Sequence, residues 1–272
     1  MSVITISRGA FSGGRALAEN VASRLGYRCV DREVLIEASR RYGIPEARYT
    51  AVLETAPHWW DRWRESLRLY RLTLQAAMCE IAQGGKFVYH GHGGQELFPD
   101  IRHVLKVHLT APMEFRLAQV MDRERLDEAS AREYIERVDR ARTRRLKDLF
   151  GADWRDPSRY DLVLNISHMT LDTAAHLVVE AVQREEFQPN RQSEEDFEDL
   201  TLTARVQAAL ITSQATRNLD VHVRATRGEV HLRGVLAYAA LEGSIVDIVK
   251  ELPGVKSVVA KFDALPMDEL YH

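Results

Sequence analysis

Short apolar runs alternate with longer amphipathic stretches over the first two thirds of the chain. The apolar runs predict short strands at residues 3–6, 27–31, 87–89, 104–109 and 162–165. Between them, apolar residues recur at three- and four-residue spacing, which predicts helices after residue 14 and at 32–42, 57–83, 112–150 and 171–182. Strands that alternate with helices are typical of an α/β domain, in which helices cover both faces of a parallel sheet.

The pattern changes after residue 185. Residues 186–200 contain Pro189, Asn190 and a dense group of acidic side chains, and this composition predicts a linker. Beyond it, the pattern predicts a helix, two strands, a helix and a strand at 202–211, 219–225, 229–235, 236–250 and 255–262. We therefore expect a first domain over residues 1–185 and a small α+β domain with a thin core over 201–266.

A glycine-rich segment follows the first predicted strand and leads directly into the first predicted helix. Its sequence, from Gly9 to Ala16, is Gly-Ala-Phe-Ser-Gly-Gly-Arg-Ala, which has the strand, glycine loop and helix order of a phosphate-binding P-loop. Main-chain N–H groups of such a loop and the positive end of the helix dipole hold phosphate. The predicted phosphate-binding residues are Gly9, Ser12, Gly13, Gly14 and Arg15. The alternative is a glycine turn that only connects a strand to a helix.

The loop departs from the usual pattern at two positions. Arg15 stands where the P-loop has lysine, and Ala16 stands where it has a hydroxyl residue that binds Mg²⁺. A guanidinium keeps the positive charge but presents a planar fork of donors instead of a compact ammonium. A magnesium ion would need another ligand, and Ser12 is the first candidate, with Ser7 as the second.

Composition narrows the classes of partner. The chain has 272 residues, of which 45% are hydrophobic, and its formal net charge is −3. This charge gives no overall attraction to nucleic acid or to an anionic membrane, so we expect no nucleic-acid partner. Because the chain lacks an apolar run long enough to span a membrane and an apparent signal segment, we expect a cytoplasmic protein.

Several short motifs in the first 185 residues follow the sequence order of one enzyme family. They are the glycine loop, Gly26-Tyr27 before Asp31, Phe98-Pro99-Asp100, the group Arg137, Asp139, Arg142 and Arg144, and Leu162-Val163-Leu164-Asn165. On these residues the segment resembles the cytidylate-kinase-like family of P-loop nucleoside monophosphate kinases. The resemblance implies transfer of the γ-phosphoryl group of ATP to a nucleotide such as CMP or dCMP, with Mg²⁺.

The same resemblance implies roles for individual residues. Arg137, Asp139, Arg142 and Arg144 would belong to a mobile lid with catalytic groups, while Asp31 and His92 would lie on the acceptor side. Relatives with cytidylate kinase activity carry Gly-Arg-Asp where this chain has Gly91-His92-Gly93. Two functional hypotheses therefore stand beside each other: a kinase for a nucleoside monophosphate or related small acceptor, and a catalytically lapsed sensor that binds nucleotide and regulates partners through its second domain. A third hypothesis is a scaffold that uses both domains only for assembly.

The last region resembles a BON domain. The resemblance rests on the Val-x-Leu-x-Gly pattern at 230–234, the helix after it, and Leu-Pro-Gly-Val-Lys-Ser-Val at 252–258. It implies an interaction module with a protein or phospholipid partner. Separately, Trp59, Trp60 and Trp63 lie on the predicted helix at 57–83, where their helical spacing favours core packing over stacking on a base, with a homodimer contact as a further possibility.

Overall fold

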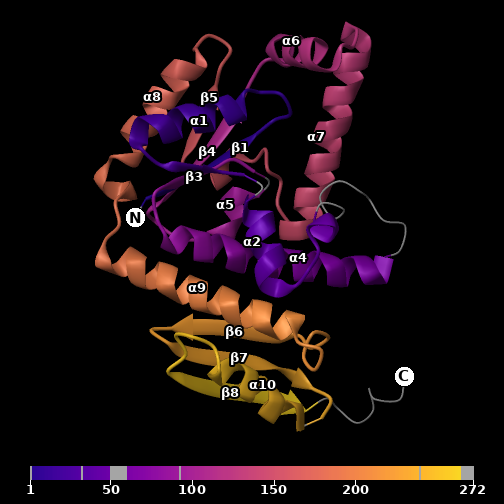
Figure 1. The fold of residues 1–272 in the computed structure, drawn as a ribbon, viewed down its shortest axis with the longest axis vertical. Helices are drawn as coiled ribbons and strands as arrows, with labels where there is room; N and C mark the ends of the chain where they lie inside the picture. The colour runs from indigo at the N-terminus through magenta and orange to yellow at the C-terminus, as the bar shows by residue number, and fades with distance from the viewer. Residues whose placement is uncertain (1, 32, 50–59, 92, 239, 265–272) are drawn as a thin grey trace.

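The computed structural model describes residues 2–31, 33–49, 60–91, 93–238 and 240–264. Over these residues it has two sheets, each with its own core, joined by one long helix that lies between them (Figure 1). Part of the predicted aromatic cluster, including Trp59, falls outside the described residues.

The first sheet has five parallel strands in the order β2-β3-β1-β4-β5. The strands are β1 (Val3–Arg8), β2 (Arg28–Val30), β3 (Phe87–Tyr89), β4 (Val104–Thr110) and β5 (Leu162–Asn165). Ile4 of β1 pairs with Val88 of β3 on one side and with Leu105 of β4 on the other. All three side chains are fully buried, which is why these strands read as near-continuous apolar runs.

Helices cover both faces of this sheet, which confirms the predicted α/β class. Ile4 and Ile6 point to one face, where α1 (Gly14–Leu25) and α8 (Leu171–Val182) pack against them. Val3 points to the other face, because side chains alternate along a strand. That face carries α2 (Glu33–Tyr42), α4 (Trp60–Gln83) and the short helix α5 (Gly94–Leu97).

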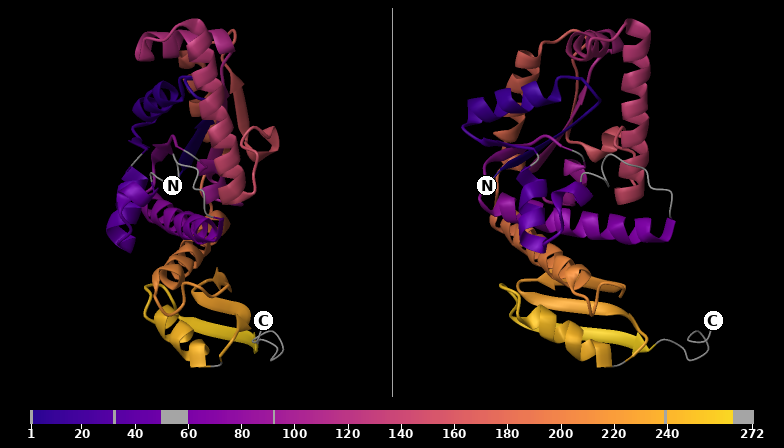
Figure 2. Two further views of the ribbon diagram at one scale, coloured as in Figure 1. Left: turned by 90° about the vertical axis from the view of Figure 1, so that its right-hand side faces the viewer. Right: turned by 45° about the vertical axis from the view of Figure 1, so that its right-hand side comes forward.

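The charged stretch at 112–150 forms two helices, α6 (Met113–Glu124) and α7 (Glu128–Phe150). α7 rises beside the sheet, and α6 lies across its upper end (Figures 1 and 2). Arg125 ends α6 with a positive φ of 55°, and the Asp127 side chain caps α7 by accepting from the Ser130 N–H at 2.8 Å. Leu149, near the other end of α7, packs into the main core. A 3₁₀ turn, η1 (Pro157–Arg159), then leads into β5.

The acidic segment differs from the predicted linker. After the turn η2 (Glu185–Phe187), residues of the expected linker form the first half of a continuous helix, α9 (Arg191–Thr212). Asn190 and Ser193 form a reciprocal capping box at its start, with the Ser193 N–H 2.9 Å from the Asn190 side chain. Acidic side chains near a helix N-terminus are stabilised by the helix dipole, so the acidic composition favours this helix.

The second domain contains a three-stranded sheet of β6 (Val221–Thr226), β7 (Glu229–Leu236) and β8 (Ser257–Ala264), with helix α10 (Ala240–Lys250) between β7 and β8. β6 and β7 are antiparallel, and β7 and β8 are parallel. The helix α9 contributes to both cores. Leu202 and Val206 pack in the core of the second domain, while Phe197, Ala204 and Ala208 pack in the core of the first.

Candidate functional site

The glycine loop between β1 and α1 is held in a conformation that its sequence explains. Gly13 is the N-cap of α1 with φ of +81°, a left-handed conformation that favours glycine. A Cβ at this position would also lie 2.9 Å from Cδ1 of Leu171. The Ser12 hydroxyl donates to the Gly9 carbonyl at 3.0 Å and closes the loop on itself. The N–H groups of the first turn of α1 have no partners within the helix, so this end is suited to an anion.

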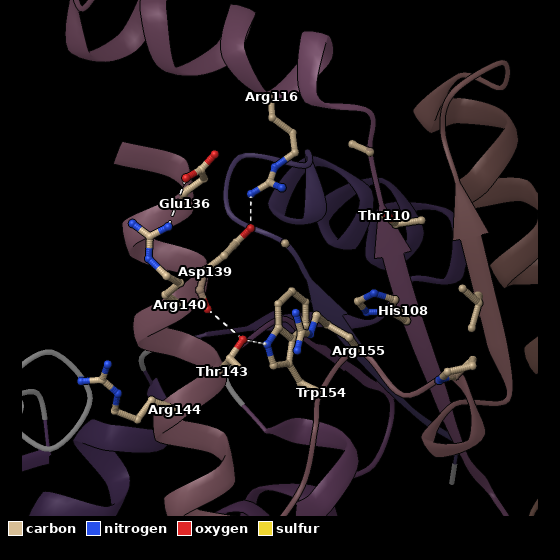
Figure 3. Close-up of a pocket in the computed structure, with 14 residues that line it drawn as sticks. His108, Thr110, Arg116, Glu136, Asp139, Arg140, Thr143, Arg144, Trp154 and Arg155 are labelled. Carbon is tan, nitrogen blue, oxygen red and sulfur yellow. Dashed lines mark hydrogen bonds and ion pairs between the residues drawn. The ribbon is translucent and has the colours of Figure 1, made fainter. Parts of the chain in front are cut away.

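Three side chains from α6 and α7 grip the backbone of this loop, and we call Arg116, Asp139 and Arg142 the loop clamp. Asp139 accepts from the Ala10 N–H at 3.0 Å, and Arg116 donates to the Ala10 carbonyl at 2.7 Å. Arg116 also pairs with Asp139 at 2.5 Å, and Arg142 donates to the Arg8 carbonyl. Figure 3 shows Arg116 and Asp139 meeting beside the loop. The clamp therefore fixes the loop from outside its own sequence.

Arg142 is the most strongly perturbed member of the clamp. Burial, together with the neighbouring charge of Arg8, lowers its pKa to about 10. Its Nε has no hydrogen-bond partner, and its guanidinium lies 5.6 Å from the centre of the Trp154 ring. The group stays protonated at neutral pH, so a desolvated positive charge lies next to the glycine loop.

The four predicted residues of α7 divide between two faces of the helix. Asp139 and Arg142, three residues apart, both point to the loop. Arg137 is exposed and lies over the Tyr134 ring at 5.2 Å, and Arg144 is exposed at the rim of the neighbouring cleft. Arg116 completes the clamp and was not predicted, because no local pattern distinguishes it on α6.

Arg15 lies away from the loop. Its side chain is 75% exposed and pairs with Glu19 one turn along α1, at 2.8 Å. A different arginine, Arg8 at the end of β1, lies across the start of α1 beside Gly14. Ser7, the second candidate for a magnesium ligand, is buried against Tyr160 and His108 instead of facing the loop.

Of the two residues predicted for the acceptor side, Asp31 lies where the parallel strands end. Asp31 directly follows β2, and its N–H donates to Glu33 at 2.7 Å. His90 follows β3, is 3% exposed, and has a pKa lowered by burial, with the Asp31 charge acting in the opposite direction. Since β2, β3 and β1 are neighbours, Asp31, His90 and Gly9 reach the same edge of the sheet. His92 lies outside the described residues.

A cleft of about 820 Å³ runs from the loop along α7 (Figure 3). Its lining includes Gly9, Thr110, Asp139 and Trp154. At its base His108 stacks on Tyr160, with 4.8 Å between ring centres, and meets Trp154 edge-on. The Trp154 indole N–H donates to Thr143 at 2.9 Å. His108 and Trp154 line the lower part of the cleft in Figure 3, and Arg116 and Asp139 of the loop clamp line its upper part.

The buried histidine predicts a pH dependence of stability. Burial lowers the pKa of His108 below its ordinary 6.5, and the Arg142 charge adds to this shift. As the pH falls, this histidine is therefore protonated in the unfolded chain at a higher pH than in the folded protein. The free energy of unfolding is expected to fall below about pH 6.5, with a slope of up to about 1.4 kcal/mol per pH unit for this group. Urea unfolding of the wild type and of His108→Gln between pH 5 and 7.5 measures it. An unchanged slope in the variant contradicts the prediction.

The order of the parallel strands, with a glycine loop between the first strand and the first helix, defines a P-loop fold. Residues 3–168 match the model of the Cytidylate kinase-like family, and the chain belongs to this family. Residues 198–266 match the BON domain.

Individual relatives of the chain carry the same family name. A cytidylate kinase from Methanopyrus kandleri is 28% identical over 188 residues, which cover 66% of this chain and 92% of the relative. A cytidylate kinase from Pyrobaculum aerophilum is 30% identical over 65% of this chain and 90% of the relative. In structure, an uncharacterized protein from Eubacterium ventriosum aligns with a TM-score of 0.53 and 20% identity over 66% of this chain and 97% of its own, which supports the fold. Within the described residues, none of the helices is both long and apolar enough to cross a membrane.

Proposed function

We propose that the protein transfers the γ-phosphoryl group of ATP to a nucleoside monophosphate of the CMP or dCMP type, or to a related small acceptor. The observation that carries the proposal is the clamped glycine loop, whose backbone is bonded to Asp139 and Arg116 and which lies beside the desolvated guanidinium of Arg142. Phosphoryl transfer depends mainly on positioning and on stabilising charge over the phosphoryl oxygens. Membership of the family and the relatives named cytidylate kinase support the same chemistry.

The parts of the site have distinct expected roles. The N–H groups around Gly13 and Gly14 would hold the phosphates of ATP at the start of α1, and Arg142 would neutralise part of their charge. Asp31, at the carboxyl end of β2, would lie beside the acceptor. We propose that Arg137 and Arg144, on the exposed faces of α7, approach the ligand only when this helix moves.

The oxygen ligands that the protein offers near the glycine loop fit a magnesium ion that arrives with the nucleotide. Among the described residues there is no group of three or more His, Cys, Asp or Glu side chains that could hold a metal. Magnesium bound with a nucleotide takes most of its oxygen ligands from phosphates and water, so one or two protein oxygens are enough. The Ser12 hydroxyl oxygen, held at the loop by its bond to Gly9, would be one of them. The ion would supply neutralisation of phosphate charge.

A second candidate function is a nucleotide sensor without turnover. The shared helix α9 favours it, because one face packs on the first domain and the other forms part of the second. The exposed position of Arg15 and the absence of a hydroxyl at Ala16 also remove two groups that a P-loop kinase normally uses. In this reading, nucleotide binding at the loop would be transmitted through α9 to a partner of the BON domain.

ADP release measured with Mg²⁺ and ATP against CMP, dCMP, UMP and AMP separates the two functions. The kinase predicts ADP formation that depends on one acceptor above the rate without acceptor. Nucleotide binding without turnover supports the sensor instead. Binding is followed by thermal unfolding, where a ligand at a hundred times its dissociation constant adds about 2.7 kcal/mol of stability. Lack of any shift with every nucleotide contradicts both functions and leaves the scaffold.

A further inference from the structure

Arg8 occupies a position at the loop that the sequence pattern did not reveal. It is the last residue of β1, and its half-buried side chain runs across the first residue of α1. A Cβ on Gly14 would lie 2.9 Å from both Cγ and Nε of Arg8. Gly14 does not have a positive φ, so its backbone conformation does not require glycine. The close approach of the arginine side chain explains why this position lacks a Cβ. The loop is thus built with space for this side chain.

The charges around Arg8 are those of an anion site. Burial lowers the pKa of Arg8, while the charge of Asp31 opposes that shift. Arg142 is a second desolvated cation close enough that Arg8 lowers its pKa too. Asp139, the carboxylate that offsets Arg142, already accepts bonds from Arg116 and from the Ala10 N–H. Two desolvated cations that repel each other are stabilised by an added anion such as a phosphate group.

We propose that Arg8 is the cationic side chain that contacts the polyphosphate of the bound nucleoside triphosphate, in the role that lysine has in most P-loops, and that Arg15 has no such contact. The inference rests on the proposed function, since both the kinase and the sensor bind this ligand. Arg8 reaches the start of α1 from the end of β1, and its side chain lies against Gly14, where the loop passes into the helix. Arg15 reaches outward to Glu19.

Titration calorimetry with Mg·ATP, and with inorganic tripolyphosphate as a probe without a base, tests the proposal. The variants are Arg8→Met, Arg8→Lys and Arg15→Met, with Arg24→Met, an exposed arginine of α1 that pairs with Asp172, as the matched control. Loss of a hydrogen bond between charged groups predicts about 10- to 100-fold weaker binding of both probes in Arg8→Met. Arg8→Lys should recover part of this loss, because it keeps the charge and lacks the fork. Arg15→Met and Arg24→Met should stay within about twofold of the wild type.

Each result decides a different point. One outcome is that the wild type binds the probes, Arg15→Met binds them more weakly, and Arg8→Met and Arg8→Lys bind them as the wild type does. This outcome overturns the inference and leaves the proposed function standing. A wild-type protein that binds neither probe overturns the proposed function and the inference with it. Circular dichroism of each variant without ligand checks folding. If Arg8→Met is unfolded, the comparison of Arg8→Lys with Arg15→Met decides, because weaker binding is expected only in the former.

Discussion

Replacing Asp139 with alanine is expected to lower the free energy of unfolding by about 3 kcal/mol, because it removes the carboxylate that offsets two largely buried arginines. The side chains of Arg116 and Asp139 are only 12% and 23% exposed, and their ion pair measures 2.5 Å. The substitution also leaves the Ala10 N–H without its acceptor, which removes one bond from α7 in the loop clamp and leaves the bond from Arg142 to the Arg8 carbonyl. We therefore expect nucleotide binding to weaken together with stability, measured by urea unfolding and by calorimetry with Mg·ATP.

Glu136→Ala is the matched control, since it removes a carboxylate of α7 one turn away. Glu136 pairs with Arg140 at 3.1 Å, but the two side chains are 48% and 63% exposed. An exposed pair of this kind contributes about 0–1 kcal/mol, so the control should unfold nearly as the wild type does. Equal loss of stability in the two variants would show that the loop clamp adds nothing beyond an ordinary surface pair.

The fold was predictable because its signals are local. Each strand of the first sheet is a short run of apolar residues, and the parallel arrangement follows from the helices between them. The glycine loop is readable in the same way, because Gly13 must adopt a left-handed conformation and glycine is the residue that does so at least cost. The split of the charged stretch into α6 and α7 was not predicted, although Asp127 followed three residues later by Ser130 is a readable cap.

The members of the site were less predictable, because tertiary contacts select them. Arg8 and Arg116 carry no local pattern, and only packing brings both to the loop. Arg15 could have been assigned to the surface, since Glu19 stands four residues later on the same helix face and invites an i,i+4 pair. In α7 the helical spacing places Asp139 and Arg142 on a different face from Arg137 and Arg144. The sequence does not say which of these faces meets the loop.

The acidic segment was misinterpreted because composition was weighed above periodicity. Phe197, Thr201, Ala204 and Ala208 repeat at three- and four-residue spacing and are all buried. Of the acidic residues beside them, Glu194, Asp196 and Glu198 are exposed, and Glu195 and Asp199 are half-buried. The consequence is structural: the first domain is completed by a helix that belongs equally to the second, and Arg205 of this helix pairs with the mostly buried Glu80 of α4 at 2.6 Å.

Phe197→Ala is the second substitution with a large expected effect, because Phe197 fixes α9 to the first domain. Its ring is 9% exposed and lies 6.3 Å from the centre of the Phe98 ring and 5.8 Å from that of His103. Truncation of a buried phenylalanine predicts a loss of about 3–5 kcal/mol. We also expect calorimetry to resolve two unfolding transitions where the wild type has one, since the shared helix then holds the first domain only through Ala204, Ala208 and the Arg205–Glu80 pair among the contacts described above.

Tyr238→Ala provides an aromatic control in the second domain, because Tyr238 is 67% exposed. Its loss is expected to change stability by less than about 0.5 kcal/mol, as for a surface position. The result also bears on the sensor hypothesis, since a signal passed through α9 requires both domains to respond to the same ligand. In Phe197→Ala, a nucleotide should therefore raise the melting temperature of the first domain's transition only. In Tyr238→Ala it should raise the melting temperature of the single transition of the whole protein. A wild type that already unfolds in two independent transitions would contradict this coupling.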